Sequence, residues 1–233
     1  MRIIVPDSLN MITTYVLQEQ EDWFEDEIKF LRKLVQPGHK VIDIGANYGV
    51  YTLTLAHLAG PTGYVWAFEP ASATASLLTA SVAVNNFRNV FVEQKALSCE
   101  KGAAQLSLND NSELNALVHD YASGNKSETV TLTTLDECYE TYNWKDIDYI
   151  KLDAEGEEEK ILRGGGVFLA AESPLIQYEV KAGKDLHLEL VKAFDGIGYK
   201  SYRLVPGLNV LAPFEMDEPA DGYLLNLFSC KPD

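Results

Sequence analysis

The stretch KVIDIGANYGVYTLTLA, Lys40–Ala56, decides the fold that this sequence predicts. It begins with the apolar residues of a buried strand, passes through a turn with glycines at Gly45 and Gly49, and continues with apolar residues at helical spacing. A strand, a glycine turn and a helix in this order are typical of nucleotide-binding α/β units. Such a turn can bind a phosphate, a dinucleotide or another ligand. The residues around the turn indicate which of these ligands it binds.

Strand-like and helix-like runs alternate after this stretch. Further strands are expected at 64–70, 90–97, 148–154 and 174–180. Strands that alternate with helices of about 10 to 15 residues predict βαβ units and a mostly parallel sheet. The last two expected strands, 199–205 and 223–230, are joined by the loop Pro206–Gly222 without a helix. A hairpin there would make the last strand antiparallel to its neighbours.

The chain is expected to have one domain with two additions. Residues 1–36 should form an N-terminal extension with a helix over Gln18–Leu34, and residues 37–233 a single domain. Inside it, the runs GAAQLSL and SETVTLTTL interrupt the alternation of strands and helices. They can pair around the polar loop Asn109–Lys126, which predicts an inserted hairpin around 101–133.

Composition excludes several classes of protein. The 233 residues suit one α/β domain, and no run of about 18 apolar residues predicts a membrane span. The three cysteines match neither a disulfide framework nor a zinc site, and we expect a cytoplasmic protein with reduced thiols. A net charge of −16 argues against a nucleic-acid partner and favours a neutral or cationic substrate.

Acidic residues stand at the ends of the expected parallel strands: Asp43, Glu69, Asp153 and Glu179. Ligands of open α/β sheets bind at this edge. Glu69 is the most informative, because it ends the apolar run YVWAF and is followed by Pro70. A carboxylate at the end of the second strand can accept hydrogen bonds from the hydroxyl groups of a ribose, so the site is predicted to bind a nucleoside.

The glycine turn narrows the choice of nucleoside. A dinucleotide fingerprint has a second glycine where Ala46 and Asn47 stand here, and the Walker phosphate motif is absent. Asp43, two residues before the first glycine, would repel a phosphate but suits a cationic amino-acid group. This combination fits S-adenosylmethionine, whose sulfonium and amino groups are both positive.

Three segments resemble the FkbM family of S-adenosylmethionine-dependent methyltransferases: VIDIGANYGVYTL, AFEP and IDYIKLDAEGEEEKILRGG. The similarity extends from about Pro37 to Glu179, and the run from Lys151 to Glu158 is its most specific part. The resemblance implies a class I, Rossmann-like methyltransferase sheet of seven strands with helices on both faces, and O-methylation as the usual activity.

The resemblance also implies how the cofactor would bind. Asp43, Gly45, Asn47 and Gly49 would hold the methionine part, Glu69 the ribose, and the segment Lys95–Leu97 would lie against the adenine. The full set of predicted cofactor-binding residues is Asp43, Gly45, Ala46, Asn47, Tyr48, Gly49, Glu69, Pro70, Ala96, Leu97 and Asp153.

Methyl transfer to a hydroxyl requires alignment of the reactants and a base that takes the proton. The predicted catalytic residues are Asp153 and Glu155, which follow the fourth strand, and Lys151, which lies on the same strand face as Asp153. His119 is an alternative base. Asp153, Glu155 and Glu179 together offer oxygen ligands for Mg²⁺, but no metal motif is present, so no metal ion is predicted.

The predicted acceptor is a hydroxyl group of a sugar, a glycan or a small natural product. Methylation of nitrogen or of a carboxylate stays open, as does a non-catalytic nucleoside-binding module. A nicotinamide-dependent oxidoreductase is disfavoured by the missing fingerprint glycine. The walls of the acceptor site are expected from the N-terminal helix and from the loops Asn109–Lys126 and Pro206–Gly222, and the sequence carries no indication of oligomeric state.

Overall fold

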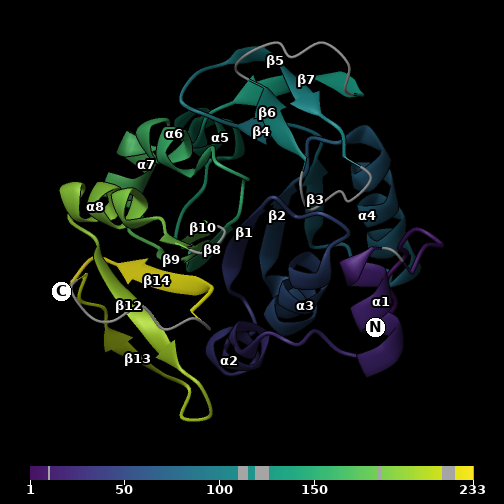
Figure 1. Cartoon of the computed structure of the whole chain (residues 1–233), viewed down its shortest axis with the longest axis horizontal. Coiled ribbons are helices and arrows are strands. Elements are labelled where there is room, and N and C mark those ends of the chain that lie inside the picture. The colour runs from purple at the N-terminus through teal and green to yellow at the C-terminus, as the bar shows by residue number, and fades with distance from the viewer. Residues whose placement is uncertain (10, 110–114, 119–125, 183–184, 217–223, 233) are drawn as a thin grey trace.

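A sheet of eight strands runs through the molecule (Figure 1). The computed structural model describes the chain apart from residues 10, 110–114, 119–125, 183–184, 217–223 and 233. From one edge to the other, the strands are β13 (Val210–Pro213), β12 (Lys200–Val205), β14 (Asn226–Cys230), β9 (Leu175–Glu179), β8 (Tyr149–Leu152), β1 (Lys40–Ile44), β2 (Tyr64–Phe68) and β3 (Val90–Glu93).

The strands β9, β8, β1, β2 and β3 are parallel to one another. All four residues of β8 are buried, as are four of the five in β2, because helices cover both faces of the sheet. β14 is antiparallel to both of its neighbours, β9 and β12. The predicted α/β fold, with a mostly parallel sheet and an antiparallel last strand, is confirmed.

The prediction of seven strands is wrong by one. The additional strand is β13, which lies in the segment Pro206–Gly222 that was expected to be a loop. Gly207 and Asn209 have φ angles of 79° and 54°, which allow the chain to reverse its direction directly after β12. β13 then pairs with β12 in antiparallel register, Val205 opposite Val210.

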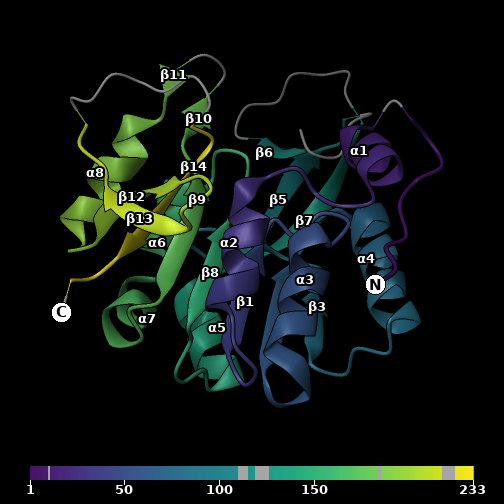
Figure 2. The same ribbon diagram turned by 90° about the horizontal axis from the view of Figure 1, so that it is seen from below.

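Helices cover both faces of the sheet, as predicted (Figure 2). α2 (Asp26–Leu34), α3 (Val50–Ala59) and α4 (Ser72–Val84) lie on one face, and the other face carries α5 (Leu135–Tyr142), α6 (Glu158–Arg163), α7 (Gly166–Ala171) and α8 (Leu188–Gly196). Alternate strand residues supply the two cores: Val41 packs with the first group of helices, whereas Ile42 and Ile44 pack with the second. Among the described helices, none is long and apolar enough to cross a membrane.

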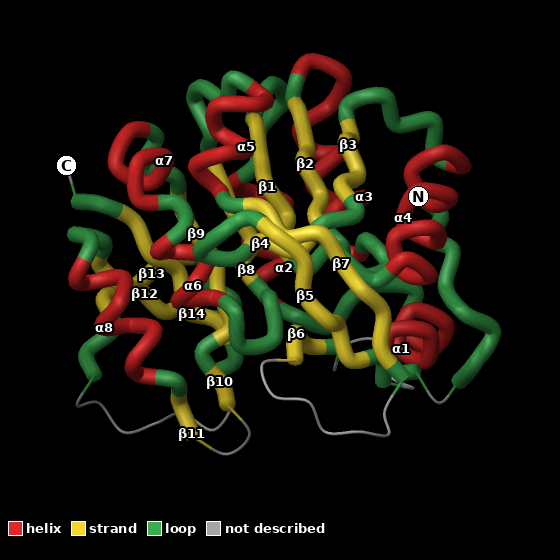
Figure 3. Tube along the Cα trace, turned by 90° about the horizontal axis from the view of Figure 1, so that it is seen from above, coloured by secondary structure: helices red, strands yellow, loops and turns green. Residues whose placement is uncertain are grey.

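A second sheet lies beside α5 and α6, away from the β12–β13 hairpin (Figures 1 and 3). Its strands, in spatial order, are β4 (Ala96–Leu97), β7 (Ser127–Thr133), β5 (Gly102–Ser107) and β6 (Ala116–Val118). β5 and β7, the two runs predicted to pair, form an antiparallel ladder. The smaller elements are a 3₁₀ turn at Gly60–Thr62 and the short strands β10 (Lys181–Ala182) and β11 (Asp185–Leu186).

The prediction of one strand over 90–97 is wrong. β3 ends at Glu93, where the N–H of Lys95 donates a hydrogen bond back to the Glu93 carbonyl oxygen at 2.9 Å. After this turn the chain joins the second sheet, in which Ala96 and Leu97 pair with β7. Apolar residues stand on both sides of the break, because β3 is partly buried and β4 is buried, so the sequence does not reveal the change of sheet.

The N-terminal segment contains two helices, α1 (Ile12–Gln20) and α2, instead of the single helix expected over Gln18–Leu34. Glu21 ends α1 with a φ of 55°. The Asp22 carboxylate then accepts hydrogen bonds from the Trp23 N–H at 2.9 Å and from the Arg32 guanidinium at 2.8 Å, which hold the chain in a non-helical turn. This turn carries the residues before α2 over the carboxyl ends of the strands.

Candidate active site

A cavity of about 410 Å³ opens at the carboxyl ends of β1, β2, β8 and β9. This edge is where open α/β sheets bind ligands, and the volume is typical of small-molecule and cofactor sites. The turns after these strands form its floor. The segments Ile12–Thr13 and Trp23–Glu25 form one wall, and residues of the second sheet, including Leu106 and Leu117, form another.

The turn between β1 and α3 packs closely against the end of β8. Gly45 has a φ of 76°, and a Cβ atom there would lie 1.7 Å from the backbone oxygen of Asp153. The N–H groups of Gly45 and Ala46 both donate to the Phe68 carbonyl oxygen at 3.0 Å. Since these donors are used inside the protein, the turn does not offer them to a phosphate, as the sequence predicted.

Asp43 is a buried carboxylate that lines the cavity and is only 1% exposed. Its Oδ2 accepts a hydrogen bond from the Thr52 hydroxyl, while Oδ1 has no partner among the described residues. Burial raises the pKa of Asp43, and the positive charge of Lys151 partly opposes this. A buried carboxylate oxygen without a partner costs free energy, which a hydrogen-bond donor that reached Oδ1 would offset.

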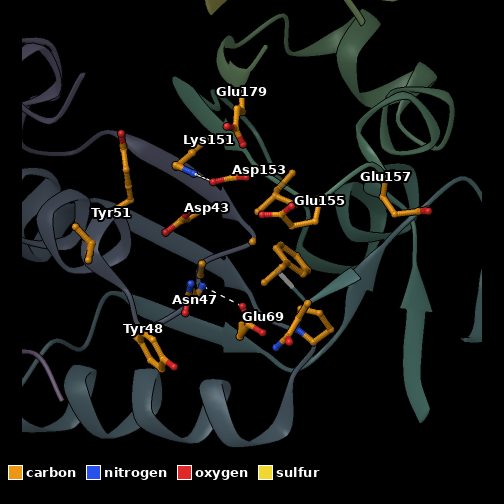
Figure 4. Close-up of a pocket in the computed structure, with 18 of the residues that line it drawn as sticks. Asp43, Asn47, Tyr48, Tyr51, Glu69, Lys151, Asp153, Glu155, Glu157 and Glu179 are labelled. Atoms are coloured by element: carbon orange, nitrogen blue, oxygen red, sulfur yellow. Dashed lines mark hydrogen bonds and ion pairs between the residues drawn. The ribbon is translucent and has the colours of Figure 1, made fainter. Parts of the chain in front are cut away.

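Glu69 fixes the turns after β1 and β2 relative to each other (Figure 4). Its Oε2 accepts a hydrogen bond from the Asn47 N–H at 3.0 Å, and its Oε1 accepts one from the Ala71 N–H at 2.9 Å. The side chain is 7% exposed, and burial raises its pKa to about 7. Each carboxylate oxygen has two lone pairs, so Glu69 can still accept hydrogen bonds from a ligand.

The raised pKa of Glu69 predicts that the stability of the ligand-free protein depends on pH. A group that titrates near 4.5 when unfolded and near 7 when folded favours the folded state at low pH. This contribution is complete below about pH 4.5 and is lost as the pH rises through 7. Urea unfolding of the wild type and of Glu69→Gln between pH 5 and 8 should show a steeper decline in the wild type, and equal slopes would contradict the assignment.

An apolar surface lies next to Glu69. Pro70, Ala96 and Leu97 line the cavity there, together with Leu106 and Leu117 from the second sheet. Ala96, Leu97 and Leu106 are buried. Flat apolar walls of this kind suit the face of an aromatic ring system.

Lys151 provides a buried positive charge on the other side of Asp43. Its Nζ lies 2.6 Å from Asp153 Oδ2 and 4.7 Å from the centre of the Tyr51 ring (Figure 4). Burial lowers the pKa of Lys151, but the negative charges of Asp153, Asp43 and Glu25 raise it by more, so its pKa is above the ordinary value. Lys151 therefore stays an ammonium group and acts as a hydrogen-bond donor, not as a base.

Three carboxylates converge beside Lys151. Asp153, Glu155 and Glu179 each offer an oxygen within 4.8 Å of the others. Burial is the main reason that the pKa of Glu155 is raised to about 8 and that of Glu179 to about 7, and the charge of Asp153 raises both further. Oxygen atoms in this number can hold a divalent cation, but Asp153 is already paired with the Lys151 ammonium.

Glu158 holds the loop after β8, which carries two of these carboxylates, Asp153 and Glu155. Its side chain, 6% exposed, accepts hydrogen bonds from the N–H groups of Ala154 at 2.8 Å and Gly156 at 3.1 Å. Between them, Glu155 has a φ of 49°, which is uncommon for a residue with a side chain. The loop after β8 is thus fixed by a carboxylate of the following helix.

The N-terminal wall contains residues that the sequence did not identify. The rings of Trp23 and Phe24 lie 5.0 Å apart, and the Tyr51 hydroxyl donates a hydrogen bond to Glu25 and accepts one from Gln177 at 3.1 Å. Trp23, Phe24 and Glu25 belong to no motif. The only indication was an aromatic pair inside an acidic segment, EDWFED, between two helical runs.

The sequence matches the methyltransferase FkbM domain family over residues 43–201. The chain belongs to this family. The match begins at Asp43 and extends across every turn of the cavity floor, and most of the N-terminal wall lies outside it. No curated protein sequence matches this FkbM-family chain.

Solved structures show the same fold. An FkbM methyltransferase from Methylobacillus flagellatus has a TM-score of 0.57 and 14% sequence identity, over 87% of this chain and 50% of that one. An S-adenosylmethionine-dependent O-methyltransferase from Thermotoga maritima has a TM-score of 0.53 and 16% identity, over 93% and 69%. A TehB-like methyltransferase from Corynebacterium glutamicum has a TM-score of 0.52 and 12% identity, over 95% of both chains. The FkbM-family chain therefore has the class I methyltransferase fold.

The structure brings nearly all predicted site residues of this FkbM-family protein into one cavity. The exception is Gly49, which does not line it. Gly49 precedes α3 with a φ of 94°, and a Cβ atom there would meet the Leu78 side chain at 2.4 Å. Its requirement for glycine therefore comes from packing against α4. His119, the alternative base, lies outside the described residues.

Proposed function

We propose that this protein transfers the methyl group of S-adenosylmethionine to a hydroxyl oxygen on a sugar, glycan or small natural product. The observation that carries the proposal is the combination, in one cavity, of Asp43 with a buried unpartnered oxygen and Glu69 at the end of β2. The first suits an amino group and the second a ribose. Family membership and the S-adenosylmethionine-dependent O-methyltransferase of the same fold support this reading.

The residues of the cavity fit the cofactor part by part. Asp43 would accept a hydrogen bond from its amino group, Glu69 would accept hydrogen bonds from the ribose hydroxyls, and Ala96 and Leu97 would contact the adenine. The close approach of Gly45 to Asp153 leaves the turn free of side-chain atoms at this point. When bound, the cofactor supplies an electrophilic methyl carbon on a positive sulfur.

The other half of the cavity would then hold the acceptor. Lys151, held in position by Asp153 and the Tyr51 ring, can donate a hydrogen bond to the acceptor oxygen. Glu155 is the base that we favour, because a group with a pKa of about 8 is well matched to proton transfer near neutral pH. Asp153 is less suited to this role, since its carboxylate is paired with Lys151.

Binding and transfer measurements test this function. Titration calorimetry should show binding of S-adenosylhomocysteine and no binding of NAD. Isotope-labelled S-adenosylmethionine, incubated with a panel of sugars and phenols, should label oxygen in at least one of them. Absence of S-adenosylhomocysteine binding would refute the cofactor assignment, and labelling at nitrogen alone would refute O-methylation.

Glu69→Ala should weaken the binding of S-adenosylhomocysteine by about 30-fold, which corresponds to about 2 kcal/mol for hydrogen bonds to a charged acceptor. The change also leaves the N–H groups of Asn47 and Ala71 without their partner. Glu69→Gln, which keeps one oxygen acceptor, should lose less. Calorimetry of both variants and of Glu140→Gln, an exposed control on α5, checks this, and unchanged affinity in Glu69→Ala would exclude contact with the ribose.

A further inference from the structure

The N-terminal wall of the cavity presents apolar side chains to solvent. We infer that the acceptor carries an aryl or alkyl group beside the hydroxyl that is methylated, and that this group binds against Trp23 and Phe24. The inference rests on the proposed function and adds the chemical class of the acceptor, a hydroxyl compound with an apolar body in place of a free sugar.

Exposed apolar side chains gather at this wall. Among the described residues, Ile12 and Phe24 are the large exposed apolar side chains that line the cavity, with 52% and 46% of their surface accessible. Single apolar side chains on a protein surface are common, but two of them on one wall of a cavity indicate a binding surface. A ligand that covers them removes apolar area from water, which favours its binding.

The segment Trp23–Glu25 lies on the acceptor side of the cavity. The Tyr51 hydroxyl donates a hydrogen bond to Glu25, and the Lys151 ammonium lies 4.7 Å from the centre of the Tyr51 ring. Figure 4 shows Tyr51 and Lys151 close together and away from Glu69, the proposed ribose-binding residue. Since Lys151 is the proposed donor to the acceptor oxygen, a group bound against this segment would lie near the reacting hydroxyl and not near the ribose.

Aliphatic side chains from two other elements also line the cavity. Val50 begins α3, and Leu225 directly precedes β14. The Val180 N–H donates a hydrogen bond to the Leu225 carbonyl oxygen at 2.9 Å, which places Leu225 beside the end of β9. The apolar lining is therefore not confined to the aromatic pair of the N-terminal wall.

Polar side chains in this half of the cavity are engaged within the protein. The Glu25 carboxylate accepts the hydrogen bond from Tyr51, and Asn226 Oδ1 accepts one from the Gln177 amide at 3.2 Å. The Lys151 ammonium has three donors, so it can still reach one hydroxyl of a ligand. These groups suit an acceptor that brings one reacting hydroxyl into an otherwise apolar site.

A free sugar is the competing acceptor. Its ring can stack on Trp23 and Phe24, but it also brings several hydroxyl groups besides the one that is methylated. Each of these needs a hydrogen-bond partner when it is buried. Ile12, Val50 and Leu225 offer no such partner and have no aromatic face. An aryl or alkyl group covers these side chains without leaving a polar atom unpaired, so the observations favour it.

Matched hydroxyl compounds test the inference by binding. Phenyl β-glucoside and methyl β-glucoside share their sugar hydroxyls, and 4-pentylphenol and phenol share a phenolic hydroxyl. Titration calorimetry compares the members of each pair with the protein saturated with S-adenosylhomocysteine. In at least one pair, the compound with the larger apolar group should bind about ten-fold more tightly.

Phe24→Ala should reduce this preference to less than about three-fold, because it removes the exposed ring from the wall. Phe91→Ala is the matched control. Phe91 is 43% exposed, close to the value for Phe24, but it lies on β3 outside the cavity lining, so its removal should keep the preference. Binding of S-adenosylhomocysteine by each variant shows that its cavity is folded.

Several outcomes would overturn the inference. These are equal binding within both pairs, a preference that Phe24→Ala leaves unchanged, or one that Phe91→Ala reduces to the same extent. A wild-type dimer in sedimentation experiments that Phe24→Ala dissociates, without a preference in either pair, would assign the wall to an interface between two copies. Wild-type binding of S-adenosylhomocysteine is measured first, so failure of the cofactor assignment is recognised separately from failure of the apolar preference.

Discussion

Lys151→Met should lower the free energy of unfolding at pH 7 by about 3 kcal/mol, the loss typical of removing one member of a buried ion pair. Lys151 is 6% exposed, and its ammonium lies close to Asp153 and Asp43. Methionine keeps the length of the side chain over the Tyr51 ring but leaves both carboxylates without a cation. Methyl transfer should also decrease, since Lys151 is the proposed donor to the acceptor oxygen.

The pH dependence of this loss distinguishes charge from packing. The carboxylates that lose Lys151 bind protons more readily in the folded variant, so the deficit should be smaller at pH 5 than at pH 8. Urea unfolding at the two pH values measures it, with Lys192→Met in an exposed pair on α8 as the control. A deficit that does not change with pH would mean that Lys151 contributes by packing alone. Lys151→Met combined with Asp153→Asn should recover part of the stability.

Gly45→Ala should destabilise the protein by at least about 3 kcal/mol, the combined cost of a strained backbone and an overpacked contact. The added Cβ atom would lie 1.7 Å from the backbone oxygen of Asp153. Backbone at the end of a strand cannot give way as a side chain would, so β1 and β8 would have to separate at the cavity floor. Thermal unfolding measures the loss, and calorimetry should show that S-adenosylhomocysteine binding is lost with it.

Gly198→Ala is the matched control for this change. Gly198 has a φ of 85°, close to that of Gly45, but an added Cβ atom there would meet no atom within 4 Å. It therefore measures the cost of the backbone conformation alone, about 1 kcal/mol. If the two variants lost the same stability, the contact between residue 45 and Asp153 would contribute nothing to the loss in Gly45→Ala. The close approach of the two turns would then not explain the requirement for glycine.

The parallel part of the sheet could be predicted because its strands are buried on both faces. Runs such as YVWAF are too apolar to lie elsewhere, and an acid at the end of such a run is unusual enough to indicate a site. The C-terminal edge of a parallel sheet then brings Asp43, Glu69 and Asp153 together, although more than one hundred residues separate the first from the last. The order of the strands in the sheet is therefore enough to predict that these three residues lie close together.

The strand β4 and the break before α2 could not be predicted, because both depend on contacts between residues that are distant in the sequence. β4 is two residues long, and only β7, thirty residues later in the chain, makes it a strand. The break before α2 follows the left-handed Glu21 that ends α1 and contains an ion pair between Asp22 and Arg32. Trp23, Phe24 and Glu25 line the cavity at this break, so the sequence alone could not assign the N-terminal wall to particular residues.

The two walls of the cavity lie in different parts of the chain. The residues proposed to hold the cofactor fall within the range 43–201 that matches the family, while Ile12, Thr13 and Trp23–Glu25 precede it. The Tyr51–Glu25 hydrogen bond is one of several contacts that join the two parts, and the packing of α2 against α3 is another. Under the proposed function, the acceptor would therefore contact residues outside the family match, whereas the cofactor would contact residues inside it. A chimera with residues 1–36 of another FkbM protein should keep the affinity for S-adenosylhomocysteine and change the acceptor.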